Sequence, residues 1–100
     1  MTCSVIWSPT ARLSYYQILE YLDENWTIKE LEAFINRTEE AIKHISQNPL
    51  LYPYSTESDT HRCVIVKQVS LFYRKNQTHV ELLVFWDSRQ DPSNLLHHIN

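Results

Sequence analysis

The cationic side chains of this protein are concentrated in its C-terminal part. Residues 61–100 carry five basic side chains against three acidic ones, whereas residues 1–60 carry four against nine, and the net charge is −3. A locally positive region can face an anionic group, so we look for a binding surface around Arg62, Arg74 and Arg89. The plain structural alternative for Arg89 is a surface ion pair with Asp87 or Asp91 of the same segment.

Histidines supply the second kind of candidate chemistry. Histidine is the side chain best suited to proton transfer near neutral pH. His97 and His98 lie in "NLLHHIN", at the C-terminus, where chains usually fray. The catalytic residues therefore stay unknown, and the candidates are Arg89, Arg62, Arg74, His97 and His98.

Several classes of site are excluded or disfavoured by composition. Glycine is absent, and loops that cradle a dinucleotide or a phosphate need glycine, because only a residue without Cβ lets the backbone approach so closely. We therefore expect no nucleotide cofactor, and no cofactor of another kind is indicated. Cys3 and Cys63 lack a metal-binding spacing, so we expect reduced, buried strand residues and no metal. Neither a membrane span nor a signal peptide is expected, which indicates a cytoplasmic protein.

The elements that must position these side chains begin with a strand and a helix. The apolar run Cys3–Trp7 predicts a strand. Ser8 followed by Pro9 predicts a helix start, because serine caps free N–H groups and proline lacks the N–H that would go unpaired. Leucines and tyrosines then recur every three or four positions from Thr10 to about Glu24, which is the period of an amphipathic helix.

A second helix and a loop follow. Thr27 and Glu30 have the spacing of a capping box, and the helix that they open must end before Pro49. The connection between the two helices is so short that we expect an antiparallel hairpin. The stretch "NPLLYPYSTESDT" holds two prolines and a polar cluster, so it predicts a loop, and we expect His61 to belong to it.

Three strands are predicted in the remainder of the chain, at Arg62–Lys67, Val69–Lys75 and Val80–Trp86. The short breaks between them allow only antiparallel neighbours. We therefore expect an α+β fold of one domain, residues 1–100, with an N-terminal strand and an antiparallel helical hairpin packed on one face of a small, mainly antiparallel β-sheet. The strand residues expected to face the helices are Val64, Leu71, Tyr73 and Leu83.

The other face of this sheet is expected to stay open. Arg62, Arg74 and Arg89 fall near strand ends, from which a long side chain can reach that face without being buried. Aromatic rings in the preceding loop can pack against a partner or stack on a base. The candidate residues for binding a target or a partner protein are therefore Arg62, Lys67, Arg74, Arg89, Tyr52 and Tyr54.

The order of these elements, together with "HRCVIVKQVSLFYRK…VELLVFWDSRQDP", resembles the RelE/ParE superfamily of toxin–antitoxin toxins. The segments "VSLFYRK" and "LLVFWDSRQDP" are similar to the pattern in the last third of those toxins, and "IWSPTARLSYYQILEYL" is similar to their opening strand and first helix. The resemblance spans almost the whole chain, and it is the succession of short pieces that is specific. It implies a prokaryotic type II module, of the kind linked to plasmid stabilization, in which an antitoxin folds across the toxin and the free toxin arrests growth.

The resemblance implies two different targets. RelE-like members cleave mRNA in the ribosomal A site, whereas ParE-like members inhibit DNA gyrase. The RelE-type pattern has lysines on the second strand, arginines in the third strand and after the fourth, and a C-terminal tyrosine. The corresponding positions here read His61, Cys63 or Ile65 for the lysines, Ser70 and Arg89 for the arginines, and Leu95 for the tyrosine. A missing donor in such a site typically costs about 3 kcal/mol of transition-state stabilisation, so the departures favour ParE-like action.

The leading interpretation is a ParE-like toxin that binds DNA gyrase and forms a hetero-oligomer with a cognate antitoxin. Two alternatives remain open. One is a ribosome-dependent mRNA endonuclease that uses Arg89, Arg62 and a histidine. The other is a family member without toxicity that only binds the antitoxin, because partners rich in phosphate usually select basic proteins and this chain is acidic.

Overall fold

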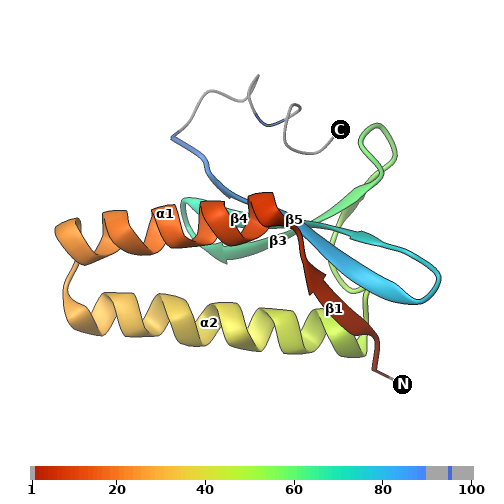
Figure 1. Ribbon diagram of the computed structural model, residues 1–100, viewed down its shortest axis with the longest axis horizontal. Helices are drawn as coiled ribbons and strands as arrows, with labels where there is room; N and C mark the ends of the chain where they lie inside the picture. Colours follow the sequence, from red (N-terminus) through yellow and green to blue (C-terminus); the bar gives the residue numbers. More distant parts are fainter. Residues whose placement is uncertain (1, 90–94, 96–100) are drawn as a thin grey trace.

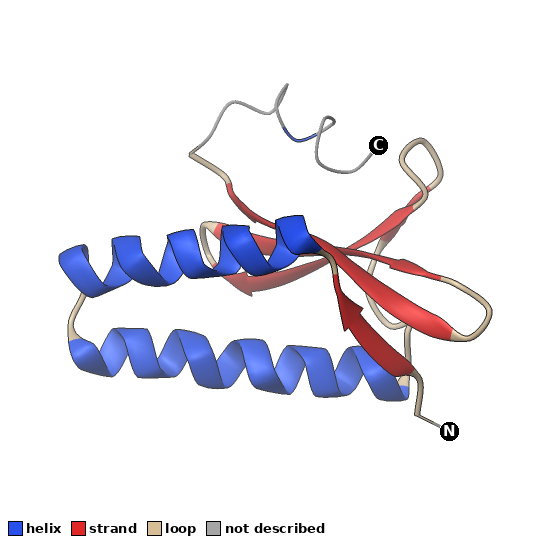
Figure 2. Cartoon of the chain, viewed as in Figure 1, coloured by secondary structure: helices blue, strands red, loops and turns tan. Residues whose placement is uncertain are grey.

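The computed structural model describes residues 2–89 and Leu95. Its elements are β1 (Ser4–Trp7), α1 (Pro9–Asn25), α2 (Ile28–Gln47), β2 (Tyr54–Ser55), β3 (Thr60–Val66), β4 (Val69–Lys75) and β5 (His79–Asp87). The strands form a five-stranded sheet in the spatial order β1-β5-β4-β3-β2, and only β1 and β5 are parallel neighbours. The two helices run side by side next to this sheet (Figures 1 and 2), which confirms the predicted α+β arrangement. No helix in the described part of the chain is long and apolar enough to cross a membrane.

Both helices begin at the capping residues that the sequence predicts. The hydroxyl of Ser8 accepts a hydrogen bond from the N–H of Ala11 at 3.0 Å, and Pro9 takes the first helical position of α1. At the start of α2, the N–H of Glu30 donates to Thr27 Oγ1, and the N–H of Thr27 donates to the Glu30 carboxylate, both at 3.1 Å. These bonds satisfy N–H groups that have no partner inside a helix. Helix α2 can therefore begin directly after Trp26 and Thr27, and the two helices form the predicted hairpin.

The main core lies between the helical hairpin and the sheet. Leu71 and Tyr73 of β4 are fully buried there, as predicted, in one cluster with Leu22 of α1 and with Phe34 and Ile45 of α2. The Tyr73 hydroxyl donates to the carbonyl of Pro49 at 2.7 Å, which ties the end of the hairpin to the sheet. A buried hydroxyl needs such a partner, because an unpaired one would lose its hydrogen bonds to water without replacement.

Two of the residues expected to face the helices do not. Val64 lies on the opposite face and is 57% exposed, since its neighbours Cys63 and Ile65 take the buried positions of β3. Leu83 fails for a different reason: the register pairs Phe72 with Val84 and Tyr73 with Leu82, so Leu83 is an extra residue in β5. A β-bulge of this kind breaks the alternation of side chains along a strand. The prediction for Val64 was wrong because the alternation was counted from the wrong residue, and the prediction for Leu83 was wrong because of the bulge.

Helix α1 completes the hydrogen bonding of β5 where β1 ends. The N–H and the hydroxyl of Ser8 donate to the carbonyls of Leu82 and Leu83, both at 3.0 Å. The N–H of Phe85 donates to the hydroxyl of Ser14 at 2.9 Å. Two serines of the first helical turns thus replace a neighbouring strand, because backbone groups buried without a partner are costly.

The expected loop before β3 contains a short strand. Tyr54 and Ser55 of β2 pair with His61 and Thr60, so His61 is a buried strand residue and not part of the loop. Its Nδ1 lies 2.9 Å from the carbonyl of Tyr52, and because a carbonyl can only accept, Nδ1 carries the proton. The sequence did not predict this strand, because it has only two residues, which are too few to show a period of two, and polar turn residues follow it.

The face of the sheet opposite the helices, called the far face below, is not simply open. Leu83, Val84 and Trp86 of β5 form a second apolar cluster there, and they are at most 7% exposed. Phe72 of β4 and Leu95 pack against this cluster. The expectation of an open face therefore holds only toward β3, where Arg62 and Val64 are exposed.

Candidate functional site

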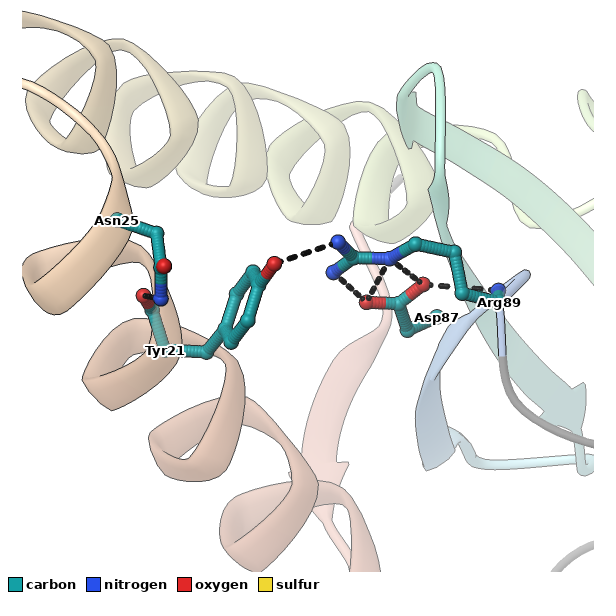
Figure 3. A network of polar contacts seen from close by, with 4 residues as sticks. All are labelled: Tyr21, Asn25, Asp87 and Arg89. Atoms are coloured by element: carbon teal, nitrogen blue, oxygen red, sulfur yellow. Dashed lines mark hydrogen bonds and ion pairs between the residues drawn. The ribbon is translucent and has the colours of Figure 1, made fainter.

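Arg89 is bound at the end of β5 by three groups of this chain. Its guanidinium forms a bidentate ion pair with the Asp87 carboxylate, and its Nε lies 2.9 Å and 3.1 Å from the two carboxylate oxygens. Its Nη1 donates to the hydroxyl of Tyr21 of α1 at 2.7 Å, and the guanidinium carbon lies 4.5 Å from the centre of the Tyr21 ring. Figure 3 shows Arg89 between Asp87 and Tyr21. The ion pair with Asp87 is the structural alternative that the sequence raised for Arg89.

The electrostatics of this network favour the charged form of both partners. Hydrogen bonds from Arg89 lower the pKa of Asp87 below its ordinary value, against the opposing effect of burial. The hydrogen bond to Asp87, followed by the one to Tyr21, raises the pKa of Arg89 further. A guanidinium whose donors are already used inside the chain has less capacity to stabilise charge on a reacting phosphate. Arg89 therefore acts here first as a link between β5 and α1.

A groove of about 450 Å³ lies between α1 and β5, and Tyr21, Asp87 and Arg89 are among the residues that line it. Its walls are mainly apolar, and they include Leu13 and Ile18 of α1 and Phe85 and Trp86 of β5. Asp87 and Arg89 are the charged residues of its lining, and their charges cancel. A groove of this composition fits an apolar group of a partner better than it fits a nucleic acid.

Arg74 is also engaged, on the far face at the end of β4. Its Nε and Nη2 donate to the carbonyls of Asp59 and Ser58, both at 3.0 Å, and its Nε lies 3.5 Å from the Asp59 carboxylate. Asp59 has a positive φ of 53°, which is unusual for a residue with a Cβ. The hydroxyl of Tyr54 donates a hydrogen bond to the same carboxylate at 2.6 Å, and this bond raises the pKa of Tyr54. Arg74 and Tyr54 thus hold the turn before β3 in shape.

Arg62 and Lys67 are the more accessible cations of the far face and its rim. Arg62 lies on β3 and donates from Nε to the hydroxyl of Ser70 at 3.0 Å, while its side chain is exposed. Lys67 is exposed in the turn between β3 and β4. Arg62 and Arg74 share the far face, but Arg89 lies against α1, so the three predicted arginines do not converge on one point.

The aromatic candidates surround His61. The His61 ring stacks on Tyr73 at 4.9 Å between ring centres, and Tyr54 lies at the same distance from its ring. Tyr54 is exposed, whereas Tyr52 is half-buried against the core. Burial and a hydrogen bond with Cys63 raise the pKa of Tyr52 to about 12, and burial raises the pKa of the Cys63 thiol. Neither is therefore prepared for proton transfer or nucleophilic attack at neutral pH.

The predicted histidine candidates His97 and His98 lie outside the described residues. Within residues 2–89 and at Leu95, no group of three His, Cys, Asp or Glu side chains is arranged to hold a metal ion. Sequence reasoning did not single out Tyr21, although its spacing of four from Gln17 and eight from Leu13 places it on the groove side of α1. The described cations and aromatic rings therefore form surfaces for contact more readily than a site for acid–base catalysis.

One family model matches most of the chain. The model of the ParE toxin of type II toxin–antitoxin systems matches residues 5–92. None of the curated proteins matches the chain in sequence.

Similar folds are found among solved toxin structures. The YoeB dimer from Staphylococcus aureus is 16% identical, with a TM-score of 0.58 over 86% of this chain and 97% of that one. A YoeB–YefM complex from the same organism is 15% identical, with a TM-score of 0.56 and the same coverage. A YoeB/ParE toxin from Agrobacterium tumefaciens is 10% identical, with a TM-score of 0.55 over 84% and 97% of the two chains. At these identities the likeness concerns the fold.

Proposed function

The chain belongs to the ParE toxin family of type II toxin–antitoxin systems, and on this premise we propose that it arrests growth by binding DNA gyrase in the cytosol. A cognate antitoxin holds it inactive in a hetero-oligomer. The toxin acts in this proposal as a binding protein, without a covalent step and without a cofactor. Its contact residues are the cations and rings that reach the surface, Arg62, Lys67 and Tyr54, with Arg74 and Arg89 shaping the surfaces around them.

One observation supports binding over catalysis: Arg62, Arg74 and Arg89 do not meet. Arg89 is bound by Asp87 and Tyr21 beside α1, and Arg74 is bound to the turn before β3. Cleavage of RNA at a 2′-hydroxyl needs a base, an acid and cations around one phosphate. The three predicted arginines do not surround one point, which supports a toxin that works by occupying its target.

The endonuclease remains the competing function, and two assays on the same preparation separate the two. We expect the purified protein at micromolar concentration to inhibit supercoiling by DNA gyrase. Message isolated after induction of the toxin should show no new cuts by primer extension. Unchanged supercoiling, together with cuts at fixed codon positions that vanish in Arg89→Ala, would establish the endonuclease instead.

A pair of arginine variants tests the contact surface of this proposal. Arg62→Ala removes an exposed cation of the far face and is expected to raise the concentration for half-inhibition of gyrase by about tenfold. Arg12→Ala removes the same charge from the exposed side of α1 and is expected to leave that concentration within about twofold. Equal effects of both variants would mean that net charge, and not the far face, determines the inhibition.

A further inference from the structure

The carboxylate of Asp87 binds both the backbone and the side chain of Arg89. The N–H of Arg89 donates to Asp87 Oδ1 at 2.9 Å, which is the bond of an Asx turn. The guanidinium of the same arginine forms the bidentate pair with both carboxylate oxygens. Because the backbone bond fixes the carboxylate beside Arg89, the carboxylate needs little further ordering to form the ion pair.

Tyr21 of α1 takes the remaining nitrogen of the guanidinium. Nη1 of Arg89 donates to the Tyr21 hydroxyl at 2.7 Å, and the guanidinium carbon lies 4.5 Å from the ring centre. All three guanidinium nitrogens are thus engaged, as Figure 3 shows. The Arg89 side chain is nevertheless 50% exposed, whereas that of Asp87 is 12% exposed. An anion from solution can therefore reach this arginine, but it meets donors that are already in use.

Asp87 binds Arg89 in the way that a phosphate would. A guanidinium binds carboxylates and phosphates alike through two parallel N–H···O bonds. A group tethered two residues away acts at an effective concentration of about millimolar or more, so a phosphate at micromolar concentration competes poorly with it. Displacing Asp87 would also leave a mostly buried carboxylate without its partner, which is costly. The ion pair therefore excludes a phosphate from Arg89.

The surroundings of Arg89 would otherwise suit a nucleic acid. Tyr21, which is 40% exposed, lines the same groove as Phe85 and Trp86. An accessible ring beside an arginine is a common combination for stacking a base and binding its phosphate. Without the charge of Asp87 the groove lining would carry one positive charge, and with it the lining carries none. The acidic residue thus decides whether phosphate is accepted here.

We propose that Asp87 is a specificity-determining residue: its carboxylate occupies Arg89 in place of a phosphate and thereby prevents this toxin from binding RNA through that arginine. A group that rejects the wrong ligand raises specificity as much as one that attracts the right ligand. The inference deepens the proposed function and rests on it, because it accounts for a toxin that binds a protein target and not RNA.

Binding of a labelled single-stranded RNA to the full chain, measured by fluorescence anisotropy at low salt, tests this role. Asp87→Asn removes the charge, while its amide oxygen can still accept from the N–H of Arg89. We expect this variant to bind the RNA about tenfold more tightly than the wild type, with a logarithmic salt slope steeper by about 0.7. Asp23→Asn changes the net charge equally at an exposed position of α1, and it should stay within about twofold of the wild type.

Two further variants make the assignment specific. Adding Arg89→Ala to Asp87→Asn should abolish the gain in affinity, since the released guanidinium is its source. Asp87→Ser, whose hydroxyl can also accept from the Arg89 N–H, should reproduce the gain of Asp87→Asn and serves in its place if that variant does not fold. Thermal unfolding of every variant shows that the compared proteins are folded.

The outcomes separate this inference from the proposed function. A gain for Asp87→Asn no larger than that for Asp23→Asn, or a gain that persists after Arg89→Ala, would overturn the role of Asp87. Inhibition of DNA gyrase by the wild type is measured on the same preparation. If the wild type leaves supercoiling unchanged while Asp87→Asn gains RNA affinity through Arg89, the proposed function fails and the role of Asp87 in excluding phosphate stands.

Discussion

At the scale of single residues, two of the three predicted arginines are bound by groups of this chain. The guanidinium of Arg89 is used by Asp87 and Tyr21, and that of Arg74 by the backbone of the turn before β3. Such bonds fix the geometry of a side chain but consume the donors that a ligand would need. Arg62 donates from Nε to the neutral hydroxyl of Ser70, so it keeps a greater capacity for a new partner.

The Asp87–Arg89 pair makes a contribution to stability that depends on pH. Because the pKa of Asp87 is lowered in the folded state, the contribution is present above the pKa of the unfolded chain and is lost as the pH falls through the folded value. Between about pH 5 and pH 2, the unfolding free energy of the wild type should therefore fall more than that of Asp87→Asn, by up to about 1 kcal/mol. The guanidinium is half-exposed, which keeps this value small.

Urea unfolding at a series of pH values measures this difference. Asp23→Asn, which changes an exposed carboxylate of α1, is the matched control and should follow the wild type. Parallel curves for the wild type and Asp87→Asn would show that the pair contributes nothing to folding.

At the scale of the elements, the start of helix α1 supplies hydrogen bonds to β5 where no neighbouring strand does. The strand β1 ends at Trp7, and β5 continues beyond it with a bulge at Leu83. Ser8, the N-cap of α1, and Ser14 of α1 then bind the carbonyl of Leu83 and the N–H of Phe85. This arrangement fixes α1 on the edge of β5, and it thereby forms the groove that Arg89 helps to line.

Ser14→Ala tests this role of α1. The substitution leaves the N–H of Phe85 without its acceptor, and an unsatisfied buried donor costs about 1–3 kcal/mol. Alanine is the better helix former by a few tenths of a kcal/mol, which offsets part of the loss. We therefore expect a net decrease of about 1–2 kcal/mol in the unfolding free energy, measured by urea denaturation.

Ser46→Ala supplies the comparison for that measurement, because Ser46 lies in α2 and its exposed hydroxyl donates to the carbonyl of Lys43. We expect its unfolding free energy to stay within about 0.5 kcal/mol of the wild type. A Ser14→Ala protein as stable as Ser46→Ala would mean that water replaces the serine at Phe85.

At the scale of the whole molecule, the sheet has apolar side chains buried on both faces. The helical hairpin covers one face, and the cluster of Leu83, Val84 and Trp86 lies on the other, in contact with Leu95. The accessible part of the far face is thereby limited to the side near β3, where Arg62 and Val64 are found. The surface proposed for the target, which includes Arg62, consequently involves β3.

The second cluster predicts a measurable effect of Leu95. Leu95→Ala removes a half-buried side chain that packs against Trp86 and its neighbours, so we expect a loss of about 1–2 kcal/mol in the unfolding free energy. Leu50→Ala, at a position that is 69% exposed, should change it by less than about 0.5 kcal/mol. A loss for Leu50→Ala as large as that for Leu95→Ala would contradict the assignment of the cluster.

Much of the fold followed from local signals. The caps at Ser8 and Thr27 can be predicted from the three residues that follow each of them. The breaks between the last three strands were short enough to require antiparallel pairing. The position of Leu83 was missed because a bulge shifts the alternation without any mark in the sequence. That of Val64 was missed because the run of apolar residues around it does not show which side chains face the core. The family was recognised from the succession of strands and helices, and the match over residues 5–92 agrees with it.

The sequence by itself determined the elements, their order and the residues that carry charge, because capping, periodicity and turn chemistry act over a few neighbouring residues. Only the tertiary structure decided which charges are available. Tyr21 is 68 residues from Arg89 in the chain, and Asp59 is 15 from Arg74. Contacts over such separations depend on how α1 and the strands pack, so no local pattern could show the contacts of Arg89 with Tyr21 and of Arg74 with Asp59.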